Sequence, residues 1–370
     1  MRKILILANS SVGLYRFRKE LLVSLIDQQF SLYVSVPLGT NTGELKELGC
    51  TVIDTPIDRR GTNPFTDLRL FACYVNLLRN IKPDLVLTYT IKPNTYGGLI
   101  CRLRNIPYIV NITGMGSTIN NDGFIKNIVL SMLKTSLQQA SYVFFQNEMN
   151  LQYFVNKKIV ISKYRLIPGS GVNLSENCVE EYPTGEQISF LFVGRVMKEK
   201  GIEQYLQAAR TLRSKYPDIE FNIVGSCEER YEEELKCLEK QDIILFHGYQ
   251  KNIHDFYRDC HALIMPSHHE GMSNVLLEAA ACGRPVIASD IPGCRECLDE
   301  GVSGYSFEVG NTADLINKVE KFIALSYEEK RQMGLAGRAK VEREFSRQIV
   351  IDNYMEAIFQ VTDNTKEQVR

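Results

Sequence analysis

Long apolar stretches are absent from this sequence. No uninterrupted run approaches the roughly 18 to 20 residues that are needed to span a bilayer. The apolar run at residues 3–8 is also too short for the core of a secretory signal, and Asn9 follows it directly. Low-complexity tracts are absent too, and 44% hydrophobic with 24% charged residues is typical of a globular chain. We therefore expect a cytoplasmic protein whose contact with a membrane is at most peripheral.

Metal-binding and redox motifs are scarce. The ten cysteines are scattered, many within apolar runs, as is usual for reduced and buried thiols. Cys294 and Cys297 have the spacing of a redox or zinc pair, but no second pair or Cys-x-x-His accompanies them, which favours two loop thiols. The sequence also contains no Asp-x-Asp, so nothing indicates a diphosphate held by a metal.

Histidine is missing from the first half of the chain. All five histidines lie in the second half, and four recur every seven residues: His247, His254, His261 and His268. The spacing invites a heptad or metal interpretation. The segment is predicted to run through strand, helix, strand and loop, however, so equal spacing does not place these side chains on one face, and we favour coincidence.

The near-zero net charge conceals two halves of opposite sign. Residues 1–170 hold 20 Lys and Arg against 10 Asp and Glu, a charge of +10, whereas the remainder holds 23 against 34, a charge of −11. A basic half suggests an anionic partner, such as a lipid surface, a phosphorylated acceptor or nucleic acid. Scattered solvated charge without a partner is the alternative.

Short β-branched runs alternate with amphipathic stretches through the first half, and 370 residues exceed what one hydrophobic core usually supports. We expect strands at 4–8, 32–36, 51–53, 84–89, 108–112 and 142–145. Helices are expected at 16–28, 66–80, 95–104 and 123–139. This alternation predicts βαβ units in a mostly parallel, doubly wound sheet.

Turn-forming residues at 167–171 and a polar stretch at 173–187 indicate a linker, after which the alternation restarts. We expect strands at 188–193, 219–224, 243–246, 262–265 and 285–288, and a helix at 201–215. Ser326 and Glu329 have capping-box spacing ahead of a helix through residue 344, and Ser346 is a cap for a last helix. We expect domains at 1–170 and 171–345, with the helix 346–362 able to pack back on the first.

Two segments have the character of anion sites, because ligands of open α/β sheets bind beyond the carboxyl ends of strands. One is Gly13 with its neighbours after the first strand, a weak signal that also fits an ordinary turn. The other is 192–201, in which Arg195 and Lys200 flank a helix start and are suited to clamp a diphosphate. The alternative for the second segment is a solvated loop.

A third segment carries two carboxylates eight positions apart. Glu270 is expected in the loop after strand 262–265, and Glu278 within the next helix, whose N-terminus lies between them. That arrangement suits sugar hydroxyls at Glu270, phosphate at the amides of 272–275 and a ribose diol at Glu278. Because apolar residues surround Glu278, we expect its carboxylate to be buried and bonded.

The segment 270–290 resembles the Glu-x₇-Glu signature of family 4 retaining glycosyltransferases of the GT-B fold, and 193–201 resembles that family's diphosphate segment. The resemblance implies two doubly wound Rossmann-like domains that face a cleft. It implies a donor site made by Gly13, Gly194, Arg195, Lys200, Glu270, Gly271, Met272, Ser273, Asn274, Val275 and Glu278. Glu270, Arg195 and Lys200 would be the catalytic residues, with retention of anomeric configuration and neither an enzymic nucleophile nor a metal.

The first half is similar to bacterial transferases that extend polyprenyl-diphosphate-linked sugars, including N-acetylgalactosaminyl and galactosyl enzymes. The likeness lies in 15–18, 92–97 and 114–117, and it implies acceptor contacts by Tyr15, Arg16, Arg18, Asn94 and Thr95. Many relatives have a histidine near 111–114, and this sequence has none. Any role that depends on that histidine therefore lapses here.

The expected activity is transfer of N-acetylhexosamine or galactose from a UDP-sugar to a lipid-linked saccharide in capsule, exopolysaccharide or glycan assembly. The expected partners are the donor, the lipid-linked acceptor, an anionic membrane and other assembly enzymes, and not nucleic acid. The segment 124–134 fits a membrane-surface helix and a core-facing helix equally. Two other functions stay open, a UDP-sugar epimerase of the same fold and a silent nucleotide-sugar-binding subunit.

Overall fold

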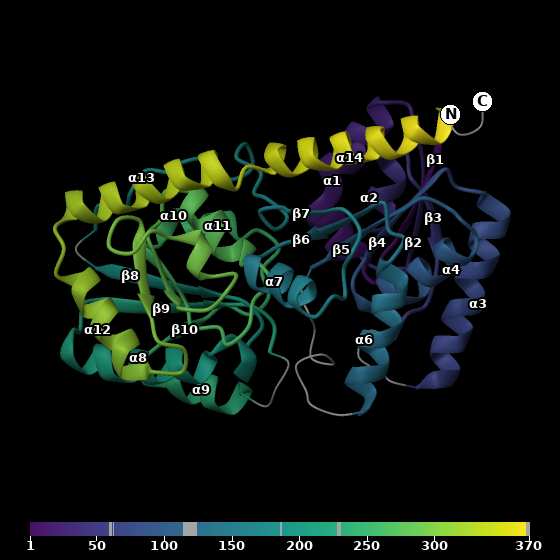
Figure 1. Cartoon of the computed structure of the whole chain (residues 1–370). Coiled ribbons are helices and arrows are strands. Elements are labelled where there is room, and N and C mark those ends of the chain that lie inside the picture. Colours follow the sequence, from purple (N-terminus) through teal and green to yellow (C-terminus); the bar gives the residue numbers. More distant parts are fainter. Residues whose placement is uncertain (59–60, 62, 114–123, 186, 228–230, 368–370) are drawn as a thin grey trace. The chain divides into compact units, whose positions relative to one another are not determined.

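The computed structural model describes residues 1–370 apart from 59–60, 62, 114–123, 186, 228–230 and 368–370. Its internal contacts divide the chain into two units, one of Met1–Ser170 with Gln348–Arg370 and one of Gly171–Arg347 (Figure 1). The 114–117 part of the family resemblance lies outside the described residues. Within the described residues, no helix is both long and apolar enough to cross a bilayer.

The first unit is built on a seven-stranded, wholly parallel sheet in the order β3-β2-β1-β4-β5-β6-β7. Its strands are β1 (Lys3–Leu7), β2 (Ser31–Val36), β3 (Thr51–Asp54), β4 (Leu85–Tyr89), β5 (Tyr108–Ile112), β6 (Tyr142–Phe145) and β7 (Tyr164–Leu166). The six predicted strands are confirmed within one or two residues, and β7 was missed. The strand order changes direction between β1 and β4, which makes their carboxyl ends the expected ligand position.

The helices of the first unit cover both faces of this sheet. They are α1 (Ser11–Asp27), α2 (Thr42–Glu47), α3 (Pro64–Ile81), the π-helix η1 (Pro93–Gly97), α4 (Gly98–Leu103), α6 (Phe124–Leu137), α7 (Glu148–Asn156) and α14 (Arg347–Glu367). α1 begins five residues earlier than predicted, because Ser10 caps it by accepting from the Gly13 amide. The helix predicted at 95–104 is confirmed, but its first part, through Gly97, belongs to the π-helix η1 and not to an α-helix.

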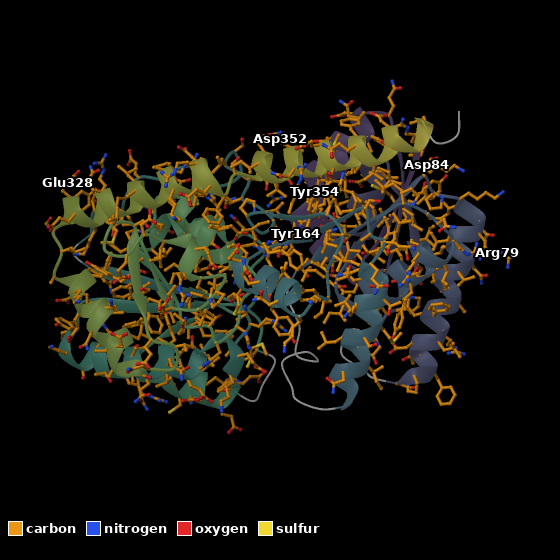
Figure 2. All side chains as sticks on the ribbon, in the orientation of Figure 1. Arg79, Asp84, Tyr164, Glu328, Asp352 and Tyr354 are labelled. Atoms are coloured by element: carbon orange, nitrogen blue, oxygen red, sulfur yellow. The ribbon has the colours of Figure 1, made fainter. Side chains whose placement is uncertain are left out.

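The last helix, α14, belongs to the core of the first unit. Its Val350, Ile351 and Ile358 are buried in one cluster with the strands of that sheet. Tyr354, which points from α14 toward the strands in Figure 2, is fully buried and its hydroxyl bonds Asn111 Oδ1 of β5. The chain therefore ends on the unit with which it began.

The second unit has a six-stranded parallel sheet in the order β10-β9-β8-β11-β12-β13. Its strands are β8 (Ile188–Val193), β9 (Ile219–Val224), β10 (Leu245–Phe246), β11 (Ala262–Met265), β12 (Val286–Ser289) and β13 (Gly304–Phe307). Its helices are η2 (Lys198–Lys200), α8 (Ile202–Lys215), α9 (Glu232–Lys240), α10 (His254–Asp259), α11 (Asn274–Ala281), η3 (Arg295–Cys297), α12 (Thr312–Ile323) and α13 (Tyr327–Glu344). The five predicted strands are confirmed, the capping box of Ser326 and Glu329 is present, and β13 was missed.

Helix α13 packs directly against α11, the helix that contains Glu278. Two glycines of α13 differ sharply in the room around them. A Cβ at Gly334 would lie 2.0 Å from the Gly283 carbonyl oxygen, whereas a Cβ at Gly337 would lie 3.5 Å from Ala280 Cβ, an ordinary contact. The close approach at Gly334 thus sets the distance between α13 and the end of α11.

We expect Gly334→Ala and Gly337→Ala to change stability in opposite directions. Gly334→Ala forces backbone apart and should lower the free energy of unfolding of this unit by about 1–3 kcal/mol. Gly337→Ala adds a methyl group without a clash and removes helix-interior glycine, so it should raise that free energy by about 0.5–1 kcal/mol. Urea unfolding followed by circular dichroism measures both, and equal effects at the two positions would contradict the packing described.

Candidate functional site

In the second unit, the strand order changes direction between β8 and β11, and these two strands pair in parallel. Ligands of open α/β sheets bind outside the carboxyl ends of strands at such a point. The loop after β8 carries Gly194 and exposed Arg195, and the loop after β11 leads to Glu270. The two donor segments predicted from the sequence therefore lie at one edge of one sheet.

Glycine at position 201 lets these two loops meet. Gly201 has a φ of +72°, and a Cβ there would lie only 1.9 Å from the Pro266 carbonyl oxygen. No side chain fits in that space, and left-handed backbone itself favours glycine. The contact continues where the His268 amide donates to the Glu199 carbonyl over 2.9 Å. The loops after β8 and β11 are thereby joined through their backbones.

Lys200 and Glu270 form an ion pair at this junction. Lys200 Nζ lies 2.5 Å from Glu270 Oε1, and the two side chains are 21% and 12% exposed. Ser267 Oγ donates to the same carboxylate oxygen over 2.8 Å. A lysine and a glutamate 70 residues apart are thus held together in a partly desolvated position, where the attraction is stronger than in water.

The N-terminus of α11 lies between the two glutamates, as predicted. Buried Ser273 is its N-cap residue, but the Ser273 side chain makes no capping hydrogen bond. Asn274 Oδ1 is buried and has no hydrogen-bond partner among the described residues. The first-turn amides and this oxygen are therefore placed to bind a ligand, and an anion is favoured at a helix N-terminus.

The loop 270–273 that precedes α11 is held from the opposite side by Gly293. Gly293 has a φ of +86°, and a Cβ there would lie 2.8 Å from the Gly271 carbonyl oxygen. Its carbonyl accepts from the Ser273 amide over 2.8 Å, and its own amide donates to Glu296 Oε2 over 2.6 Å. Met272, which is 8% exposed, packs into the core beneath. These contacts fix the backbone from which Glu270 and Asn274 project.

Glu278 is bonded, as its apolar neighbours predicted, but it is half-buried where full burial was expected. Its Oε2 accepts a hydrogen bond of 2.9 Å from the hydroxyl of Tyr257, which is 1% exposed and lies on α10. Val275, one turn earlier on α11, is half-buried and packs against the same core. The carboxylate is oriented by a rigid partner and stays partly accessible.

The remaining predicted residues lie in the first unit, at the ends of β1 and β4. Gly13 is in the first turn of α1, and its amide is occupied by the Ser10 cap over 3.1 Å. Tyr15 is half-buried and Arg16 is exposed on the same helix. Tyr15 and Arg16 thus stay candidates for acceptor contact, whereas the Gly13 amide is already used.

Arg18 requires a correction. It is 4% exposed, and its guanidinium carbon lies 5.3 Å from the Tyr89 ring centre and 5.6 Å from that of Tyr354. Its Nη1 donates to the Phe17 carbonyl over 2.8 Å. The side chain is therefore part of the packing between α1, β4 and α14, and this position does not support a direct acceptor contact.

Asn94 and Thr95 lie in the π-helix that follows β4. Asn94 Nδ2 donates to the Asn111 carbonyl over 2.8 Å, while Asn94 Oδ1 and Thr95 Oγ1 are buried without a hydrogen-bond partner among the described residues. On β4, Thr88 Oγ1 is also buried without a hydrogen-bond partner among the described residues. Such atoms require water or a ligand, which keeps this end of the sheet a candidate binding position.

Within the described residues, neither the histidine repeat as a whole nor the Cys294–Cys297 pair forms a site of its own. Of the four regularly spaced histidines only His254 lies in a helix, at the start of α10, and the others lie in connecting segments, so they form no heptad face, in agreement with coincidence. Cys294 and Cys297 are fully buried, and burial raises the pKa of both thiols. High thiol pKa values oppose redox chemistry, which agrees with two loop thiols.

Two family models match the chain, one described as glycosyl transferases group 1 over residues 179–340 and one as glycosyl transferase 4-like over residues 3–147. The chain belongs to the family 4 glycosyltransferases. The N,N′-diacetylbacillosaminyl-diphospho-undecaprenol α-1,3-N-acetylgalactosaminyltransferase of Campylobacter jejuni is 26% identical, over 97% of this chain and 98% of that protein.

Solved structures show that the transferase has the GT-B fold. A glycosyltransferase of Rickettsia africae superposes with a TM-score of 0.81 at 19% identity, over 98% of this chain and 99% of that one. HepE of Anabaena in complex with UDP and glucose superposes with a TM-score of 0.78 at 17% identity, over 97% and 100%.

Three residues of the candidate site escaped sequence reasoning: Ser267, Tyr257 and Gly293. Gly293 had a signal, because a Pro-Gly pair after a predicted strand indicates a tight turn. Ser267 lies in the stretch between strand and first glutamate, where its polar side chain was visible. Tyr257 lies in the helix that was predicted between strands 243–246 and 262–265, but nothing in the sequence indicated its partner, since only the fold brings it to Glu278.

Buried His261 makes the second unit of the transferase sensitive to acid. Burial first, and then the nearby charges of Lys330 and Arg284, lower its pKa to about 4. Its Nδ1 accepts from the Ser189 amide over 3.1 Å, a bond that requires unprotonated Nδ1. Folding therefore favours neutral His261, so its contribution is present above the unfolded-state pKa and is lost as the pH falls toward 4.

We expect the free energy of unfolding of the second unit to fall by about 2 kcal/mol between pH 7.5 and pH 5 through His261 alone. In His261→Asn, which keeps an acceptor but cannot be protonated, this part of the decrease should disappear. Urea titrations of both proteins at the two pH values measure it. An identical pH dependence in wild type and variant would show that His261 is not the responsible group.

Proposed function

We propose that this transferase moves a sugar from a UDP-sugar to a polyprenyl-diphosphate-linked saccharide with retention of anomeric configuration. The observation that carries the proposal is the Lys200–Glu270 ion pair beside the uncapped N-terminus of α11. HepE, a structural neighbour, is described in complex with UDP and glucose. The Campylobacter relative is named for a diphospho-undecaprenol-linked acceptor.

The leaving diphosphate has a complementary position in the second unit. The first-turn amides of α11 supply aligned donors, and Arg195 and Lys200 supply positive charge at the adjacent loop. Preorganised charge of this kind stabilises the negative charge that develops as the glycosidic bond to phosphate breaks. In this proposal, the leaving phosphate also receives the acceptor proton on the same face, so no protein nucleophile is required.

The Lys200–Glu270 ion pair is able to break when a donor binds, with Lys200 then contacting the diphosphate and Glu270 the sugar. A diphosphate carries more negative charge than one carboxylate and attracts the Lys200 ammonium. Glu270 is then able to accept hydrogen bonds from sugar hydroxyls, while Ser267 keeps its carboxylate oriented. Glu278, oriented by Tyr257, accepts from the ribose diol. Each carboxylate thus has a separate task along the donor.

We place the acceptor at the carboxyl ends of β1 and β4 in the first unit. Exposed Arg16 and the unpartnered atoms of Asn94 and Thr95 occupy this edge. The charge of +10 on residues 1–170 favours a diphosphate lipid and peripheral contact with an anionic membrane. Helix α6 buries Leu133 and Leu137, as a core-facing helix does, but exposes Ile128, as a membrane-surface helix does. Both interpretations of segment 124–134 therefore stay open.

Two further candidates fit the same fold, a UDP-sugar epimerase and a silent subunit of an assembly complex. An epimerase converts the donor without any acceptor and requires acid and base groups, for which the first 170 residues supply no histidine. A silent subunit does not need the complete set of Arg195, Lys200, Glu270 and Glu278. The complete set favours the transferase.

The deciding experiment is a panel of UDP- and GDP-sugars incubated with a short-chain polyprenyl-diphosphate sugar. We expect acceptor-dependent release of UDP and one α-linked product from one UDP-sugar, detected by mass spectrometry and NMR. Donor conversion without acceptor would indicate the epimerase. Tight UDP binding without transfer from any donor would indicate the silent subunit.

Substitution of the two glutamates should separate binding from turnover. Glu278→Ala removes a charged hydrogen-bond partner of the ribose and should weaken UDP binding about 10- to 100-fold. Glu270→Ala frees Lys200 for phosphate, so UDP binding should hold or tighten, while turnover falls roughly 100-fold. Calorimetry with UDP and initial rates at saturating donor measure the two effects.

Glu320→Ala is the matched control for both glutamate variants. Glu320 is a half-buried carboxylate of the same unit that accepts from Lys215 and Tyr216, away from the strand ends that carry the site. We expect its UDP affinity and turnover to equal those of wild type. If Glu278→Ala binds UDP as tightly as this control, the ribose assignment is wrong.

A further inference from the structure

Three ligand-type side chains converge at the start of α10, outside the donor site. Cys178 Sγ, a carboxylate oxygen of Glu180 and an imidazole nitrogen of His254 all lie within 4.8 Å of one another. Cys178 Sγ is 3.6 Å from Glu180 Oε1, and His254 Nε2 is 3.5 Å from the same oxygen. His254 Nε2 is buried and has no hydrogen-bond partner among the described residues.

From this geometry we propose that Cys178, Glu180 and His254 bind one zinc ion, with water as the fourth ligand. Zinc takes sulfur at about 2.3 Å and nitrogen or carboxylate oxygen at about 2.0–2.2 Å in a tetrahedron. Those bond lengths place neighbouring ligand atoms about 3.3–3.7 Å apart. The two separations above fall in that range, so a small rotamer adjustment completes the site.

The chemistry of the three ligands selects the metal. A thiolate and an imidazole disfavour Ca²⁺ and Mg²⁺, which prefer oxygen ligands, whereas zinc accepts sulfur, nitrogen and oxygen together. One thiolate and one carboxylate also neutralise the two positive charges of the ion. Arg258 lies close enough to interact with Glu180, but its guanidinium is already bonded to Asp255 and Asp259.

The backbone that carries these ligands is fixed on both sides. The Glu180 amide donates to the Cys282 carbonyl over 3.2 Å, and Arg338 Nη1 donates to the Asn177 carbonyl over 2.7 Å. The His254 amide donates to Asn252 Oδ1 over 3.1 Å at the start of α10. The irregular segment 177–180 is therefore held by hydrogen bonds to the end of α11 and to α13 before any metal enters, which lowers the cost of ordering the ligands.

Zinc at this position fastens residues 178–180 to α10. One turn further along α10, Tyr257 donates to Glu278, so metal binding restrains the helix that orients this carboxylate. The ion is a clamp and takes no part in bond breaking. The inference that these residues bind a metal does not depend on the proposed function. Only the expectation that metal binding affects UDP affinity, through Tyr257 and Glu278, rests on the proposed function.

Cobalt titration of the full-length, chelator-treated protein tests the site. We expect one equivalent of Co²⁺ to give the visible spectrum of a tetrahedral ion with a thiolate-to-metal charge-transfer band, and Zn²⁺ to abolish both. Cys178→Ser should lose the charge-transfer band, and His254→Ala should weaken Co²⁺ binding at least about tenfold. Thermal unfolding should shift upward with Zn²⁺ in wild type and not in either variant.

Cys237→Ser is the matched control, because Cys237 is also an exposed thiol of the second unit and lies near Gln241. It should keep the wild-type spectrum and the wild-type response to Zn²⁺. Absence of stoichiometric Co²⁺ binding in wild type, or an unchanged charge-transfer band in Cys178→Ser, would overturn the proposal. Because no UDP is present in these titrations, their failure is distinct from failure of the transferase assignment.

Discussion

The proposed donor site depends on one place where two backbones touch. At Gly201, a Cβ would lie 1.9 Å from the Pro266 carbonyl oxygen, so only glycine lets the loop after β8 reach the loop after β11. Lys200 precedes this contact and Glu270 lies four residues after Pro266, which is why the two side chains meet at 2.5 Å. The ion pair is thus a consequence of backbone packing at the switch point of the sheet, and not an independent attraction between distant charges.

The position of Glu278 depends on a second, deeper contact. Arg284 is fully buried, and its guanidinium donates to the carbonyl oxygens of Tyr257, Glu181 and Arg258 over 2.7, 2.6 and 3.2 Å. Two of these carbonyls belong to α10, whose Tyr257 hydroxyl reaches Glu278. A buried charge without such partners would cost several kcal/mol, on the order of 3–5. The guanidinium therefore holds α10 in the position from which Tyr257 orients Glu278, the proposed ribose contact.

Sequence patterns predicted the features that local chemistry determines. Strands such as 142–145 and 262–265 are continuous apolar runs buried on both faces, and Ser326 with Glu329 forms a capping box through neighbouring residues. Strand β7 was missed because its three residues, with exposed Tyr164 and Leu166, carry no apolar run. The role of Tyr257 and the turn of Arg18 into the core were equally invisible, since they depend on contacts across 21 and more than 300 residues.

The first unit also has a buried arginine, Arg18, that contacts a helix next to a candidate binding position. Arg18 lies beside the stacked rings of Tyr89 and Tyr354, and Tyr354 comes from α14, the last helix of the chain. The Tyr354 hydroxyl bonds Asn111 Oδ1, while Asn111 Nδ2 donates to the Thr88 carbonyl, so α14 is tied to the ends of β4 and β5. At the same ends, Asn94 and Thr95 keep buried polar atoms that the described residues do not satisfy. Because α14 holds the ends of β4 and β5 in place, the unsatisfied atoms of Asn94 and Thr95 stay fixed where a bound molecule is able to form hydrogen bonds with them, as the proposed acceptor site requires.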